Sequence, residues 1–150
     1  MRIAVIGAGA MVPSTAAACP FTMKCIWWTP RPRWWTTSAG RESAWRSRTG
    51  YTFTARGGNL HGGFGAGGLI VLFVKSLYSK AALSGNPCLI GPDTYVLTLQ
   101  NGCGHEDILS EFVPRERIII GTTQDNGAAL GPGHVRRGGT GHTNVGMLTG

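Results

Sequence analysis

The chain has 150 residues, a formal net charge of +7 and a pI near 9.8. This length suits one domain with a sizeable core and leaves little room for a second domain of similar size. No run of about 18 or more apolar residues occurs, so a membrane-spanning helix is not expected and we predict a soluble, cytoplasmic protein. A basic chain ordinarily suggests a nucleic-acid or anionic-membrane partner, so the location of its charge matters.

The N-terminus predicts a buried first strand over residues 1–6, followed directly by Gly7-Ala8-Gly9. A strand that enters a glycine-rich turn is typical of dinucleotide-binding folds. There the first glycine makes the turn and the second lets backbone N–H groups approach a pyrophosphate. Val12 stands where the third small residue is expected, so an ordinary glycine-rich turn remains an alternative. A secretory leader is another alternative, although glycine and proline interrupt the apolar run.

Residues 12–63, here called the basic stretch, differ from the rest of the chain. They hold all five tryptophans and seven basic residues against one acid, whereas the rest has seven basic residues against six acids. Neither the strand period nor the helix period organises their apolar residues. One interpretation is a binding module in which tryptophans stack on bases or enter a lipid interface while arginines hold phosphates.

A shifted reading frame is the second interpretation of the basic stretch. If one G is lost after the Met11 codon, the repaired codon of Val12 encodes glycine, which restores the third residue of the fingerprint. In the restored frame, the codons of residues 24–29 encode a β-branched and apolar strand that ends in an aspartate. A second strand of a dinucleotide-binding fold should end in such a ribose-contacting acid. A compensating shift must then lie between about residues 57 and 68, a range set by where the regular pattern resumes.

Regular elements follow the basic stretch in chain order. Residues 69–74 predict a buried strand ending at Lys75, and Ser76 is expected to cap a helix that runs to Leu83. Residues 93–99 predict a strand that ends at a turn, residues 106–112 a helix, and residues 117–123 another strand. The glycine-rich sequence from Gly127 onward indicates a less regular β segment. The alternation predicts the α/β class: a Rossmann-type parallel sheet with flanking helices, incomplete or distorted over residues 12–63.

No metal site is predicted. The four cysteines form no CxxC pair and have no histidine at zinc-ligand spacing, so they are expected to be free thiols in a reducing compartment. His105, His134 and His142 stand in text typical of loops, and we expect no metal-binding or catalytic role for them.

Four strings carry a family resemblance. They are IAVIGAGAM at residues 3–11, FVKS at 73–76, LQNG at 99–102 and GPGHV at 131–135. In this order and approximate spacing they resemble the ketopantoate reductase (2-dehydropantoate 2-reductase) family. The resemblance implies that residues 1–150 are a dinucleotide-binding domain for NADPH (NADP), and that a helical C-terminal catalytic domain is absent from this chain.

The resemblance also implies site residues. Gly7, Ala8, Gly9, Ala10 and Met11 resemble the pyrophosphate loop. Lys75 resembles a cofactor-contacting lysine, Asn101 resembles a residue between nicotinamide and substrate, and Gly127 lies near a last cofactor contact. A lysine at the carboxyl end of a parallel strand sits at the ligand-binding edge of such a sheet, and an asparagine offers both donors and an acceptor. A solvated lysine and an ordinary Asn-Gly turn are the alternatives.

In the family that it resembles, NADPH reduces the ketone of 2-dehydropantoate to pantoate, for pantothenate and coenzyme A biosynthesis. A lysine of the C-terminal domain donates the proton. None of Lys24, Lys75 and Lys80 corresponds to that lysine, so we expect no catalytic residue here and no activity from this chain alone. The expected partner is a small 2-oxo acid, with no specific nucleic acid and no membrane. A binding module built on the basic stretch and a non-enzymatic Rossmann domain remain the alternatives.

Overall fold

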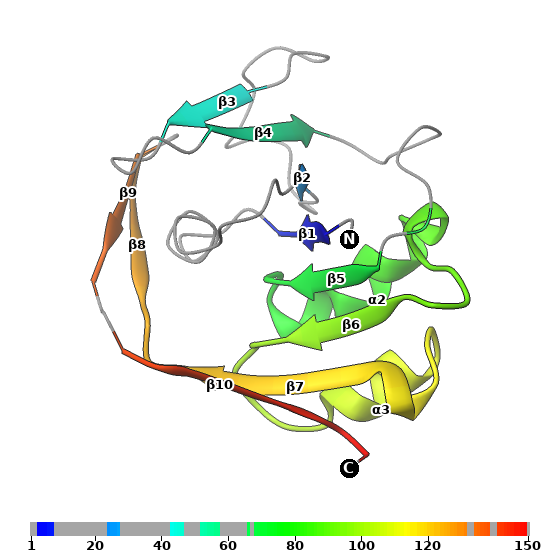
Figure 1. Ribbon diagram of the computed structural model, residues 1–150. Helices are drawn as coiled ribbons and strands as arrows, with labels where there is room; N and C mark the ends of the chain where they lie inside the picture. The colour runs from blue at the N-terminus through cyan, green and yellow to red at the C-terminus, as the bar shows by residue number, and fades with distance from the viewer. Residues whose placement is uncertain are drawn as a thin grey trace.

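The computed structural model describes residues 3–7, 24–27, 43–46, 52–57, 66, 68–131, 134–138 and 141–149. Within them an eight-stranded sheet runs in the order β10-β7-β6-β5-β1-β2-β4-β3 (Figure 1). Its strands are β1 (Ile3–Ile6), β2 (Lys24–Trp27), β3 (Ser43–Arg46), β4 (Thr52–Gly57), β5 (Leu69–Leu72), β6 (Tyr95–Thr98), β7 (Ile118–Thr123) and β10 (Thr143–Met147).

The six inner strands of this sheet are parallel, from β4 at one side to β7 at the other. Numbered by their order along the chain, they follow the 3-2-1-4-5-6 arrangement of dinucleotide-binding folds. The edge strands β3 and β10 are antiparallel to their neighbours. The predicted α/β class with a Rossmann-type parallel sheet is therefore confirmed, and three of the strands come from the basic stretch.

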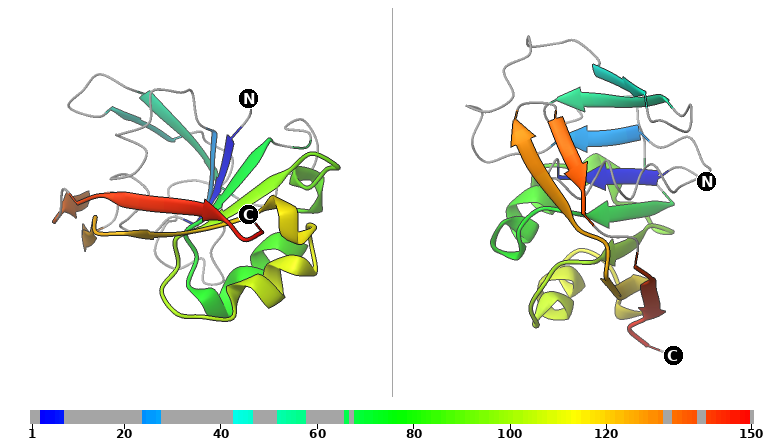
Figure 2. Two further views of the ribbon diagram at one scale, coloured as in Figure 1. Left: turned by 60° about the horizontal axis from the view of Figure 1, so that its bottom comes forward. Right: turned by 90° about the vertical axis from the view of Figure 1, so that its left-hand side faces the viewer.

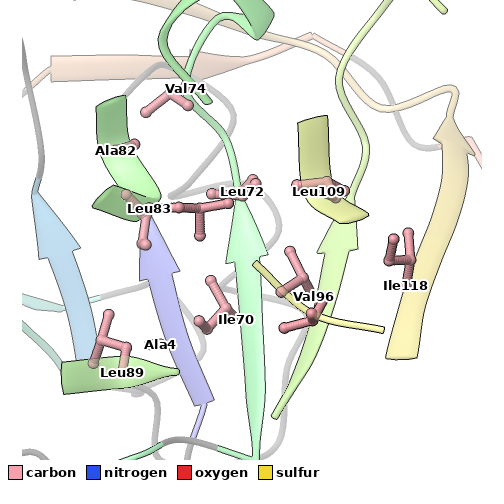
Figure 3. Packing of buried hydrophobic residues seen from close by; sticks show 12 residues of the cluster. Ala4, Ile70, Leu72, Val74, Ala82, Leu83, Leu89, Val96, Leu109 and Ile118 are labelled. Atoms are coloured by element: carbon pink, nitrogen blue, oxygen red, sulfur yellow. The ribbon is translucent and has the colours of Figure 1, made fainter. Parts of the chain in front are cut away.

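The core lies between the sheet and the helices α2 (Ser79–Ser84) and α3 (His105–Ser110), which share one face of the sheet (Figure 2). Both faces of β1 are buried, as expected of a continuous apolar run in a parallel sheet. Figure 3 shows Ala82 and Leu83 of α2 and Leu109 of α3 packed against Ile70, Leu72 and Val96. The single turns η2 (Ser76–Tyr78), η3 (Pro87–Leu89) and η4 (Arg115–Arg117) complete the connections.

The expected cap at Ser76 is wrong. The chain first makes the tight turn η2, in which the Tyr78 amide donates to the Lys75 carbonyl at 2.8 Å. Helix α2 then begins at Ser79, and no side chain caps it. The helix is shorter than predicted because the residues after Lys75 are used for this turn.

The expectation that His105 stands in a loop is also wrong. His105 is the first residue of α3 and is 5% exposed. Glu106 and Asp107 in the first turn favour a helix N-terminus at this point. His134 likewise lies in a strand, whereas His142 precedes β10 in an irregular segment.

The glycine-rich segment after β7 forms strands, as predicted. β8 (Gly127–Gly131) and β9 (His134–Arg137) make a separate antiparallel pair with a shift of register between Ala129 and Gly131 (Figure 1). The chain then returns along β7 as β10. None of the described helices has the length and apolar character needed to cross a bilayer.

Candidate functional site

The predicted site residues that the structure describes share the carboxyl edge of the parallel sheet. Each stands one to four residues after the end of a strand: Gly7 after β1, Lys75 after β5, Asn101 after β6 and Gly127 after β7. These four strands are consecutive neighbours in the sheet. The strand order reverses between β1 and β5, and ligands of open α/β sheets bind outside the carboxyl ends at such a point.

Gly7 is held against the end of β5. Its φ is 114°, and a Cβ atom there would lie 2.6 Å from the Val74 nitrogen and 2.7 Å from the Phe73 carbonyl carbon. The Phe73 amide donates to the Ile6 carbonyl at 2.8 Å, which continues the β1–β5 pairing up to this point. Only glycine fits both the backbone conformation and the space. The turn that the sequence predicted after β1 therefore begins at Gly7.

Lys75 follows β5 in extended backbone with φ −63° and ψ 143°. Its side chain is exposed, and no carboxylate of the described residues forms an ion pair with it. Lys80 of α2 differs in this respect because its ammonium lies 2.5 Å from a carboxylate oxygen of Glu111. The Lys75 ammonium is thus the one of these two charges that is available to an anion at the sheet edge.

Asn101 is exposed in the turn after β6, beside Gly102, whose φ is 110°. The residue before it, Gln100, is half-buried and makes the densest set of side-chain hydrogen bonds at this edge. Its Nε2 donates to the Val74 carbonyl at 2.5 Å and to the Ser79 hydroxyl at 2.9 Å, and its Oε1 accepts from the Thr98 hydroxyl at 2.9 Å. From the sequence, Gln100 was expected only as part of a turn, although it lies inside the LQNG string.

Buried polar atoms near the carboxyl edge offer few hydrogen bonds to a ligand. The Nε2 atom of His105 has no hydrogen-bond partner in the described part of the chain and lies behind the turn at Gly102. No three metal-binding side chains come together in the ranges that the structure describes. Cys88 and Cys103 are exposed and outside any disulfide.

Several predicted residues fall outside the described residues. They are Ala8, Gly9, Ala10 and Met11 of the predicted pyrophosphate loop, together with position 29, where the restored frame places an acid. Of the tryptophans, Trp27 and Trp45 fall in β2 and β3. The roles assigned to residues 8–11 and to position 29 therefore remain predictions.

A family model described as ketopantoate reductase PanE/ApbA matches residues 64–150, more than half of the chain. The chain belongs to the ketopantoate reductase family. This match contains Lys75, Asn101 and Gly127, whereas Gly7 and the whole basic stretch precede its first residue.

A 2-dehydropantoate 2-reductase of Halobacterium salinarum is 40% identical over 84 residues, which are 55% of this chain and 27% of that protein. The chain matches about a quarter of the length of the curated ketopantoate reductases. The fold agrees over a longer range. The crystal structure of a 2-dehydropantoate 2-reductase from Geobacter metallireducens superposes with a TM-score of 0.74 at 26% identity, covering 99% of this chain and 50% of that chain.

A D-mandelate dehydrogenase in complex with NADH gives a TM-score of 0.72 at 29% identity, covering 99% of this chain and 47% of that chain. The fold of this chain is thus shared with a dehydrogenase whose structure contains NADH. Members of the ketopantoate reductase family are oxidoreductases.

Proposed function

We propose that this chain is the nucleotide-binding part of a cytoplasmic, NADPH-dependent reductase that converts 2-dehydropantoate, a small 2-oxo acid, to pantoate for coenzyme A synthesis. The observation that carries the proposal is the position of three residues at the carboxyl ends of adjacent parallel strands, where the strand order reverses. These residues are Gly7, Lys75 and Asn101. Family membership supports the reaction class.

The residues at this edge fit a dinucleotide. Gly7 and the four residues after it form the predicted pyrophosphate loop, where backbone N–H groups meet the phosphate charge. The exposed ammonium of Lys75 offers a cation to a phosphate or to a polar group of the substrate. The Asn101 amide can donate and accept, so it can orient both the nicotinamide amide and the substrate. Gly127, at the start of β8, provides a further backbone contact. NADPH, when bound, supplies the hydride.

The proton for the new hydroxyl comes, in this proposal, from a lysine of a separate helical domain. No catalytic residue is assigned within residues 1–150, and we propose that this chain binds a nucleotide without turning substrate over. The curated relatives are about four times as long as the segment that matches, which leaves room for such a domain in them.

The test is a titration of the isotope-labelled chain with NADPH, followed through backbone amide resonances, because this measurement detects millimolar binding. We expect shifts at Gly7, Lys75 and Asn101. Lys75→Ala should weaken binding by about tenfold, the effect of losing one charged hydrogen bond. The matched control is Lys80→Ala, which removes an equal charge from an ion pair between α2 and the end of α3. It should change the dissociation constant by less than about twofold.

The same titration distinguishes the alternative binding module. A polyelectrolyte site on the basic stretch would give shifts confined to residues 12–63 and would lose the ligand steeply as salt is added. That result, or equal weakening by Lys75→Ala and Lys80→Ala, would overturn the proposed function.

A further inference from the structure

We propose that Gln100 is a positioning residue that fastens the loop after β5 to the loop after β6 and so sets where Lys75 and Asn101 stand relative to each other. The inference rests on the proposed function for its ligand, although its structural part is tested without one.

The backbone alone does not hold these two loops together. The β5–β6 pairing extends only to Leu72 opposite Thr98. Lys75 and Asn101 each lie three residues beyond that last pair. In between, the Gln100 Nε2 donates to the carbonyl of Val74 at 2.5 Å. One side chain therefore connects the residue before Lys75 with the residue before Asn101.

Two buried hydroxyls fix the orientation of this amide. Thr98 and Ser79 are each 1% exposed. The Thr98 hydroxyl donates to Oε1 at 2.9 Å and accepts from the Gln100 backbone amide at 3.3 Å, which directs the Nε2 end of the side chain toward Val74. The Ser79 hydroxyl lies within 3.1 Å of Oε1 and 2.9 Å of Nε2. Since Ser79 is the first residue of α2, the network joins the end of β6, the loop after β5 and a helix. A shielded network with its donors and acceptors satisfied keeps its members in one arrangement, and here two of the three side chains are buried and that of Gln100 is half-buried.

The chemistry requires an amide at position 100. The side chain must donate to a carbonyl at one end and accept from a hydroxyl at the other, and among side chains of this length only glutamine does both. A carboxylate of the same shape has no donor for Val74 and would place two acceptors against each other. Gln100→Glu is thus a substitution that preserves volume and removes the connection.

The first experiment compares backbone amide resonances of the unaltered chain, Gln100→Glu and the control Gln124→Glu, without ligand. Gln124 is exposed after β7, so the control makes the same chemical change away from the network. We expect Gln100→Glu to shift the amides of residues 74 and 75, which lie about 25 positions away along the chain, as well as residue 101. Shifts confined to residues 99–101 would overturn the proposal whether or not the chain binds NADPH.

The second experiment is a double-mutant cycle on NADPH binding. Gln100→Glu should weaken binding by about fivefold in the unaltered chain and by less than about twofold when Lys75→Ala is already present, because its effect passes through Lys75. Equal weakening in both backgrounds would mean a general structural effect and would overturn the positioning role. Absence of NADPH binding by the unaltered chain would overturn the proposed function, and the first experiment would still decide on Gln100.

Ser79→Ala serves as the second variant if Gln100→Glu fails to fold. It removes one hydroxyl from the network and places a strong helix former in the first turn of α2. We expect the same pattern of shifts at residues 74, 75 and 101 with smaller amplitude. An unchanged spectrum at residues 74 and 75 would contradict the proposal.

Discussion

At Gly7 the absence of a side chain lets β1 end against the backbone of β5. Gly7→Ala would combine an unfavourable φ of 114° with a contact of 2.6 Å to a backbone nitrogen that cannot move without disturbing the sheet. We expect a loss of about 2–4 kcal/mol in the free energy of unfolding, measured by urea denaturation.

Two other glycines separate the cost of the positive φ from the cost of the close contact. Gly104 has φ 77° with open space around a Cβ, and Gly146 has open space and no positive φ. Gly104→Ala should cost about 1 kcal/mol from backbone strain alone, and Gly146→Ala should cost less than about 0.5 kcal/mol. If all three substitutions cost the same, the close approach at Gly7 would not be the cause.

The site residues show what sequence can and cannot give at this scale. Lys75 and Asn101 were predicted because each stands in a recognisable string next to the end of an apolar run, and the structure places both at the expected edge. Gln100 was missed since its partner is the carbonyl of Val74, 26 positions away, and a turn signal says nothing about such a bond. The burial of His105 was missed for a similar reason, because it depends on the packing of a short helix.

Among the elements, α2 depends on a small number of buried side chains. Leu83 is 1% exposed in the core, whereas Leu77 of η2 is 83% exposed. Leu83→Ala should lower the free energy of unfolding by about 2–5 kcal/mol, the range for removing a buried leucine side chain. Leu77→Ala makes the identical change at the surface and should cost less than about 0.5 kcal/mol. Similar denaturation midpoints for the two variants would contradict the packing of α2 on β5.

The strands were easier to predict than the helices. Apolar, β-branched runs marked β1, β5, β6 and β7, because strands buried in a parallel sheet carry such runs on both faces. Helices α2 and α3 have six residues each, so their periodicity was too short to fix their boundaries. The antiparallel return of β10 along β7 could not be predicted, since glycine-rich text with one valine has no strand period.

At the scale of the whole molecule, the shifted-frame interpretation predicts a gain of binding. A chain in which the frame is restored after the Met11 codon and corrected again before Leu69 should regain the glycine at position 12 and an acid after β2. We expect its NADPH dissociation constant, measured by calorimetry, to be at least about tenfold lower than that of the chain as it stands.

The control for this prediction is a restored chain that keeps Val12. It should recover only part of the affinity, because a β-branched side chain would remain where helix and strand must pack closely. Equal, weak binding by all three chains would contradict the shifted-frame interpretation.

The overall class of fold was predicted from alternating elements, but the order of its strands depends on pairings between distant segments that periodicity does not specify.

The pairing of β1 with β5 joins Ile3 to Leu69, so 65 residues must emerge between the two partners during synthesis. The entropy lost in closing such a loop rises only with the logarithm of its length. Substituting all residues of the intervening segment without changing its length therefore leaves the entropic cost of joining the two strands nearly unchanged. The order in which the chain leaves the ribosome then matters more, because β1 has neither its neighbour β5 nor the helices α2 and α3 that cover the sheet until residues beyond Leu69 have been made. A nascent chain halted before Leu69 is consequently the form of this protein most exposed to capture by chaperones or to aggregation.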